Sequence, residues 1–245
     1  DGTLEVIRSA LIQNQADIPC NPAMPDPIVS TGGGLRIEGI GTLTQARFED
    51  STLSGNIGRN GGAIHVVAIS DTGATPDVVV DLIRSTVVGN QAACGLGDGL
   101  YIQETSGQEG VIQYNGSIIH GNGRLVNDDV IGTDCQSNFP NQDFLSIDGN
   151  ILDSEDQCPT FGFDLMISDL STVIDPVLNG THYVPRGNGP AVDNQNLFIF
   201  CPMGVLDQLG QSRAGGPGQG GTRCEAGAVE FPGFVDAIFS DRFEP

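Results

Sequence analysis

The chain repeats a short phrase of alternating apolar and polar residues, and each copy ends in an asparagine. The clearest copy runs from Ser51 to Asn56, passes a glycine-rich turn, and continues into an apolar strand that ends at Val66. Apolar alternation bounded by glycine turns is typical of β-strands. Self-similarity at such spacings indicates a repeat architecture, in which each unit stacks on the next. The closing asparagines are Asn14, Asn56, Asn90, Asn122 and Asn150.

The strand after each glycine turn alternates with period two, which predicts one face toward a core and one face outward. The inward set is Leu35, Ile37, Ile64, Val66, Leu100 and Ile102. The outward set is Arg36, His65 and Tyr101, and His65 is expected to be a plain surface residue. A third apolar strand precedes each serine, at 42–48, 78–83 and 111–114. Three strands per repeat, stacked at a spacing of about 4.8 Å, predict an all-β fold: a right-handed parallel β-helix, or β-solenoid, of about five coils.

The recurring asparagines have a structural explanation in such a stack. Equivalent residues lie above one another, so an inward asparagine can hydrogen-bond along the stack as a ladder. Tolerance of left-handed turn geometry would explain an asparagine equally well. Both readings make these residues structural rather than catalytic.

The repeat predicts the division of the chain. Coils are expected over residues 1–186, with the repeat degrading after about residue 123. A loop-rich, disulfide-tied cap is expected over 187–233 and a C-terminal tail over 234–245.

Six cysteines, none in a C-x-x-C pair, favour three disulfides in an oxidising compartment over a zinc site. Closeness in sequence favours Cys135–Cys158 and Cys201–Cys224. Cys20 and Cys94 then remain for each other, because each follows a repeat asparagine by a few residues and would lie on the same edge of the stack.

The formal charge of −21 makes nucleic acid an improbable partner, because phosphate binding needs a basic face. No apolar run approaches the roughly 20 residues of a membrane span. No cofactor is indicated, although Asp128, Asp129 and Asp134 could supply oxygen ligands for a structural Ca²⁺. A solvated acidic turn explains these three residues as well.

An enzyme of the pectin-lyase type would need a base beside the substrate carboxylate. The chain has no lysine, and none of its ten arginines stands in a suggestive cluster. Paired carboxylates for glycoside hydrolysis cannot be singled out among 31 acids. The sequence therefore assigns no catalytic residue.

The region from Asp134 to Glu230 resembles the C-terminal part of bacterial secreted proteins with a choice-of-anchor Q domain. These are similar to polymorphic outer-membrane-protein repeats. The residues that carry the resemblance are Asp134-Cys135, Gly149-Asn150-Ile151-Leu152, Cys158, Asp175-Pro176, Gly189-Pro190-Ala191-Val192-Asp193, Cys201, Asp207-Gln208-Leu209-Gly210, Arg213 and Cys224-Glu225-Ala226-Gly227-Ala228-Val229-Glu230. The resemblance implies a parallel β-helix exported to the bacterial cell surface or beyond, and it implies no defined reaction.

These observations predict a secreted or cell-surface protein with a structural or adhesive role. A β-helix has open strand edges at its ends, which invite pairing. Self-association is therefore expected through the ends and the C-terminal tail, giving head-to-tail extracellular filaments. The alternatives are a polysaccharide lyase or hydrolase, or a carbohydrate-binding module with a glycan as its partner.

Overall fold

The computed structural model describes residues 2–16, 32–40, 43–69, 78–93, 96–104, 109–126, 129–138, 143–154, 158–192, 205–213 and 224–230. Regular structure in these ranges is β-strand, apart from a short 3-10 turn, η2 (Leu170–Thr172). The predicted all-β class is confirmed. No helix within the same ranges is long and apolar enough to cross a membrane.

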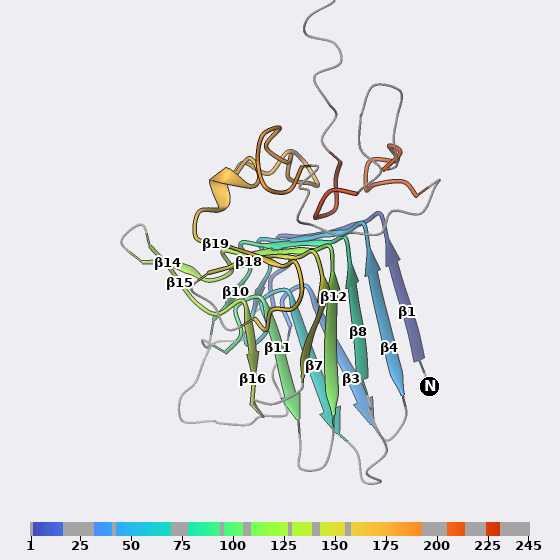
Figure 1. Ribbon diagram of the computed structural model, residues 1–245. Coiled ribbons are helices and arrows are strands. Elements are labelled where there is room, and N and C mark those ends of the chain that lie inside the picture. The colour runs from blue at the N-terminus through green and yellow to red at the C-terminus, as the bar shows by residue number, and fades with distance from the viewer. Residues whose placement is uncertain are drawn as a thin grey trace, which may run out of the picture.

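The strands form three larger parallel sheets that the chain visits in turn (Figure 1). The five-stranded sheet holds, in spatial order, β1 (Gly2–Ile7), β4 (Thr44–Glu49), β8 (Val78–Ile83), β12 (Gly110–Asn115) and β17 (Phe144–Asp148). The six-stranded sheet holds β2 (Ala10–Ile12), β5 (Thr52–Ser54), β9 (Thr86–Val88), β13 (Ile118–His120), β18 (Ile151–Asp153) and β19 (Leu165–Ile167). The four-stranded sheet holds β3 (Leu35–Ile40), β7 (Ile64–Ile69), β11 (Leu100–Glu104) and β16 (Cys135–Ser137).

Two smaller pairs lie between these sheets along the chain. Strands β6 (Ile57–Gly58) and β10 (Gln91–Ala92) pair in parallel, and β14 (Arg124–Val126) forms an antiparallel hairpin with β15 (Asp129–Ile131). From β1 to β18 the three larger sheets follow one another in a fixed cycle: a strand of the five-stranded sheet, then one of the six-stranded sheet, then one of the four-stranded sheet. The last strand, β19, follows β18 within the six-stranded sheet.

Neighbouring strands pair in register, so apolar side chains of successive circuits form buried columns. Phe48, Leu82 and Tyr114 align across β4, β8 and β12, and all three are fully buried. β-branched and aromatic residues at alternate positions fit a pleated surface with one buried face. Among the predicted inward residues, Leu35 is half-buried against the core, and the others are buried: Ile37, Ile64, Val66, Leu100 and Ile102.

The predicted outward column exists, but it is not a surface. Arg36, His65 and Tyr101 align across β3, β7 and β11. His65 is 0% exposed and Tyr101 5%, and their ring centroids lie 5.2 Å apart. The turn before β11 packs on Tyr101, because a Cβ at Gly97 would come within 2.7 Å of the Tyr101 Cβ. The prediction that His65 is a plain surface residue is wrong.

Segments after β19 leave the sheets and pack against the six-stranded sheet (Figure 1). The Tyr183 hydroxyl hydrogen-bonds the Ser54 hydroxyl at 2.7 Å, and the Thr86 hydroxyl accepts from the Ala228 amide at 3.0 Å. Of the predicted cap over 187–233, residues 187–192, 205–213 and 224–230 are described, whereas the tail over 234–245 lies outside the described residues.

One predicted disulfide is confirmed. Cys135 at the start of β16 is bonded to Cys158, and both residues are buried. Cys224 is also disulfide-bonded. Its predicted partner Cys201 and the predicted pair Cys20–Cys94 lie outside the described residues.

Replacing both Cys135 and Cys158 with alanine is expected to lower the free energy of unfolding. The bond joins residues 23 apart, and the loop entropy released to the unfolded chain is worth about 3 kcal/mol. Urea unfolding followed by far-UV circular dichroism would measure the change. An unchanged midpoint with an unchanged denaturant slope would contradict the prediction.

Candidate functional sites

Four of the predicted asparagines form one hydrogen-bonded column in the interior. The Asn14 amide nitrogens, Nδ2 and backbone N, both donate to Asn56 Oδ1, at 2.8 and 3.0 Å. Asn56 donates to Asn90 Oδ1 in the same way, and Asn90 donates to Asn122 Oδ1. Each of the three later side chains is buried, and each Nδ2 also donates to a backbone carbonyl of the preceding circuit. Buried carboxamides without such partners would cost free energy, so the column is a structural element.

The fifth predicted member, Asn150, belongs to a different column. Ile151 aligns with Ile118, which places Asn150 beside Ser117, and Asn150 Oδ1 accepts from the Ser117 amide at 2.9 Å. The serine column runs through Ser9, Ser51, Ser85 and Ser117, each backbone amide donating to the next side-chain oxygen. The assignment of Asn150 to the asparagine ladder is wrong.

Both columns stand at corners where the preceding residue has a positive φ. The corner before the serine column has φ of 45° to 66°, and that before the asparagine column 54° to 67°. The residues are Arg8, Asp50, Arg84, Gly116 and Gly149 at the first corner and Gln13, Gly55, Gly89 and Gly121 at the second. Glycine reaches this region without strain, which explains why a Gly-Asn pair marks either corner.

Each column ends at an aspartate. Asp134 Oδ1 accepts from Asn122 Nδ2 at 2.6 Å and from its backbone N at 2.8 Å. Asp164 Oδ1 accepts both corresponding nitrogens of Asn150, at 2.8 and 2.9 Å. A carboxylate accepts hydrogen bonds and cannot pass one on.

The three Ca²⁺ candidates are therefore not brought together as a described site. Asp134 is fully buried at the end of the asparagine column, Asp129 lies in the hairpin strand β15, and Asp128 lies outside the described residues. Over the ranges that the structure describes, no three His, Cys, Asp or Glu side chains gather as a metal site would need.

A buried ion-pair cluster joins the C-terminal segments to the sheets. Arg213 is 1% exposed and lies 2.8 Å from both Asp50 Oδ1, through Nε, and Glu230 Oε1, through Nη1. Its Nη2 donates to the Gly227 carbonyl at 2.7 Å. Arg84, also buried, contacts the same Asp50 carboxylate through Nε at 2.9 Å. Asp50 thus links a corner of the five-stranded sheet to a segment far along the chain.

Burial and the neighbouring Arg213 shift the pKa of Glu230 in opposite directions. Burial raises the pKa of Glu230 to about 7, although Arg213 opposes the rise. Asp207, fully buried, accepts the Glu230 amide through Oδ2 and the Leu209 and Gln211 amides through Oδ1. The Asp-Gln-Leu-Gly and Cys-Glu-Ala-Gly-Ala phrases therefore meet through this cluster, whose role is to hold the C-terminal segments in place.

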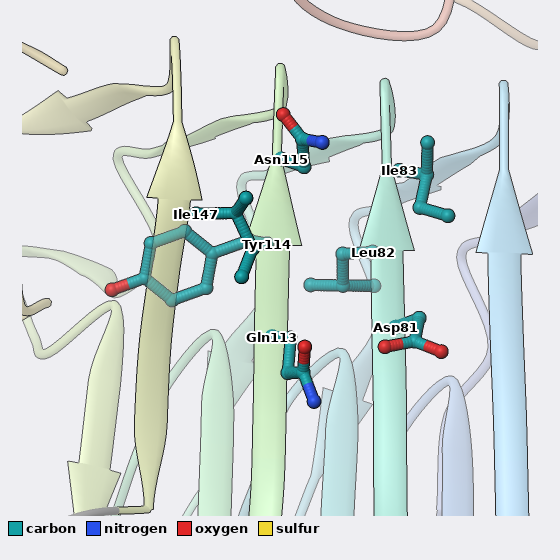
Figure 2. Close-up of a pocket in the computed structure, with 7 residues that line it drawn as sticks. All are labelled: Asp81, Leu82, Ile83, Gln113, Tyr114, Asn115 and Ile147. Carbon is teal, nitrogen blue, oxygen red and sulfur yellow. The ribbon is translucent and has the colours of Figure 1, made fainter. Parts of the chain in front are cut away.

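An open cavity of about 200 Å³ lies on the outer side of the five-stranded sheet. This β8–β12 pocket is lined by Asp81, Leu82, Ile83, Gln113, Tyr114, Asn115 and Ile147. Figure 2 shows the first three on β8, the next three on the neighbouring β12, and Ile147 between β17 and β12. A register shift between Tyr114 and Asn115 makes Ile147 an extra residue on β17. Such bulges re-aim side chains at the edge of a site.

The three outward polar side chains of the pocket have no internal partners. Within the part of the chain that the structure describes, the side chains of Asp81, Gln113 and Asn115 make no hydrogen bond or ion pair. Partial burial raises the pKa of Asp81, and Arg47 on the adjacent strand opposes that rise. Leu82 and Tyr114 are buried and form the floor, and the Tyr114 hydroxyl donates to the Pro159 carbonyl.

The alternation of β8 and β12 contained the signal for this pocket. Asp81 and Gln113 occupy outward positions of adjacent strands in register. The sequence did not single them out, because the pairing partner and the bulge at Ile147 are not readable from local pattern. With one carboxylate and no histidine among its lining residues, the pocket holds hydrogen-bonding groups rather than an acid–base pair.

No protein-family model, no curated protein and no solved structure matches this chain.

Proposed function

We propose that this chain is a secreted or cell-surface protein of bacterial origin with a structural and adhesive role rather than an enzymatic one. Its fold would be a right-handed parallel β-helix of about five coils, in which one circuit of the three sheets makes one coil. Crossover connections between parallel strands are right-handed in nearly all proteins. The resemblance of its C-terminal phrases to choice-of-anchor Q domains supports export.

The observation that carries this proposal is the pair of continuous polar columns in the interior. Each circuit is hydrogen-bonded to the next through buried side chains as well as through strands. Stacks in which each unit contacts only its neighbours form extended scaffolds. Here the columns fix the register between units, because a slip would leave buried amides unpaired.

Self-association would use strand edges. Among the described strands, β1 pairs only with β4, and its residues Leu4 and Ile7 are 40% and 43% exposed. An exposed edge with apolar side chains is a template for pairing with another copy. The Asp134 carboxylate cannot donate to Asn14 of a second copy, so the side-chain hydrogen bonds of the asparagine column would not continue across an end-to-end contact.

The experiment is multi-angle light scattering on the 245-residue chain from about 1 to 100 μM, a range in which weak protein contacts populate. Mass is expected to rise with concentration. Leu4→Lys should abolish the rise, because a lysine on an edge strand blocks pairing. Leu43→Lys is the matched control: Leu43 is 42% exposed but lies outside the strands, and assembly should persist. A constant monomer mass for the unaltered chain would reject self-association.

A further inference from the structure

The β8–β12 pocket has the composition of a small-ligand site rather than of an ordinary sheet surface. Three polar side chains with unused hydrogen-bonding capacity, Asp81, Gln113 and Asn115, stand over two neighbouring strands (Figure 2). Polar side chains at the corners of the same fold are, by contrast, engaged in the two columns. The volume of about 200 Å³ is below the roughly 300–1,000 Å³ of pockets that hold drug-sized molecules. The pocket is therefore sized for a single small ring.

We propose that the β8–β12 pocket binds one neutral sugar ring, presented by a glycan on another surface. A sugar carries adjacent hydroxyl groups, each of which donates and accepts. The Asp81 carboxylate offers acceptors only, whereas the carboxamides of Gln113 and Asn115 offer both donors and acceptors. The pocket can therefore accept hydrogen bonds from sugar hydroxyl groups and also donate hydrogen bonds to them.

Other small ligands match the pocket less well. An ammonium group has three donors and no acceptor, so it would leave the carboxamide N–H groups unused. Arg47 also lies beside Asp81 in the strand register, so this carboxylate already has a cationic neighbour. An acidic sugar would meet the Asp81 carboxylate and a chain of net charge −21, which disfavours it further. The neutral ring is the class that remains.

The flanking aliphatic residues complete the site. Ile83 is half-buried on β8, and Ile147 is 40% exposed at the bulge of β17. Both line the pocket beside the polar groups. A pyranose ring has C–H patches as well as hydroxyl groups, and contact of these patches with isoleucine side chains removes apolar area from water. Binding through one ring in an open pocket is expected to be weak, so useful adhesion would come from many copies.

The test is titration of the ¹⁵N-labelled full chain with neutral methyl glycosides of glucose, galactose and mannose, followed by NMR. At least one should shift the side-chain amide signals of Gln113 and Asn115 saturably, with a dissociation constant on the order of 1 mM, as befits about a dozen ligand atoms. The methyl glycoside of glucuronic acid should bind at least about tenfold more weakly, and 1,5-diaminopentane should not shift these signals. Absence of saturable shifts with all three neutral glycosides overturns the proposal, as does equal or tighter binding of the acid or the amine.

Variants separate this site from adventitious surface binding. Asp81→Asn and Gln113→Ala should each weaken binding about tenfold, the usual effect of losing a hydrogen bond to a charged or well-placed group. Gln45→Ala is the matched control, because Gln45 is an exposed glutamine on β4 of the same sheet and outside the pocket. Unchanged binding in both pocket variants, or equal loss in the control, overturns the assignment. The result is independent of the light-scattering experiment, since failure of sugar binding leaves the scaffold role standing.

Discussion

Replacing Arg213 with alanine is expected to lower the free energy of unfolding by about 4 kcal/mol, within the range for breaking a buried ion pair from one side. Arg213 is fully buried between Asp50 and Glu230. Among the described residues, its removal leaves no cation beside the Glu230 carboxylate and leaves Arg84 as the cation beside Asp50. The chain has no tryptophan, so far-UV circular dichroism during urea unfolding is the appropriate measurement.

The loss of stability caused by Arg213→Ala should be larger at high pH than at low pH. Burial raises the pKa of Glu230 from its ordinary value of 4.5 to about 7 in the folded chain, so the native state holds this proton more tightly than the unfolded state does. In the unaltered chain, the contribution of Glu230 to the free energy of unfolding therefore falls as pH rises from about 4.5 to 7. Removing Arg213 raises the pKa of Glu230 further, because Arg213 opposes the rise. A proton then replaces the lost cation readily at pH 5 and at a greater cost in free energy at pH 8. The destabilisation should accordingly be larger at pH 8.

Arg47→Ala is the control for Arg213. Arg47 pairs with Glu49 at 2.7 Å, but its side chain is 44% exposed. Exposed pairs contribute at most about 1 kcal/mol. Equal effects of the two substitutions would show that the buried cluster does not hold the C-terminal segments. The double variant Asp50→Asn with Arg213→Ala, compared with the two single variants, measures the coupling free energy between the two residues. Asparagine is chosen because it tolerates the positive φ of position 50.

Asn90→Ala, in the middle of the asparagine column, is expected to cost about 4 kcal/mol. The alanine removes the acceptor for the Asn56 backbone N and Nδ2, and it removes donors to Asn122 Oδ1 and the Leu53 carbonyl. Each buried group left unsatisfied costs about 1–3 kcal/mol. The urea midpoint measures the loss, and hydrogen exchange would locate it at strands β5, β9 and β13.

The same substitution at the exposed end of the column serves as its control. Asn14 is exposed and donates to Asn56, and no described residue donates to the side-chain oxygen of Asn14. Asn14→Ala should therefore cost about 1 kcal/mol or less, the net worth of an ordinary hydrogen bond. A cost at Asn14 equal to that at Asn90 would mean that local turn preference, rather than the column, explains the recurring asparagines.

The repeat in the sequence was sufficient to predict three strands per circuit, the inward apolar residues and four members of the asparagine column. It assigned Asn150 to the wrong column because the two corners of each circuit have the same local pattern. At either corner a residue with positive φ precedes a buried polar side chain, so Gly149-Asn150 looks like Gly121-Asn122. Only the pairing of Ile151 with Ile118 distinguishes them, and pairing is a property of the stack.

Other features depend on contacts between residues far apart in sequence. Alternation showed on which face His65 lies, but it could not show that His65 is buried there. An arginine within a glycine-rich region gives no sign that it will be buried, because its partner Asp50 belongs to the second circuit. The β8–β12 pocket likewise depends on a bulge between β12 and β17. Periodicity in the sequence predicts which face of a strand a residue lies on. It does not predict the bulges, or the contacts between distant segments, that form a site.

The aspartates at the ends of the two columns determine where each series of side-chain hydrogen bonds stops. Asn56 and Asn90 each donate to the asparagine of the next circuit and accept from that of the previous one, so each internal member of the column repeats the same hydrogen bonds. An aspartate side chain ends the series of side-chain hydrogen bonds, because its carboxylate accepts from the last asparagine and has no N–H group to donate. The position of the terminal carboxylate thus specifies where each interior column of side-chain hydrogen bonds ends.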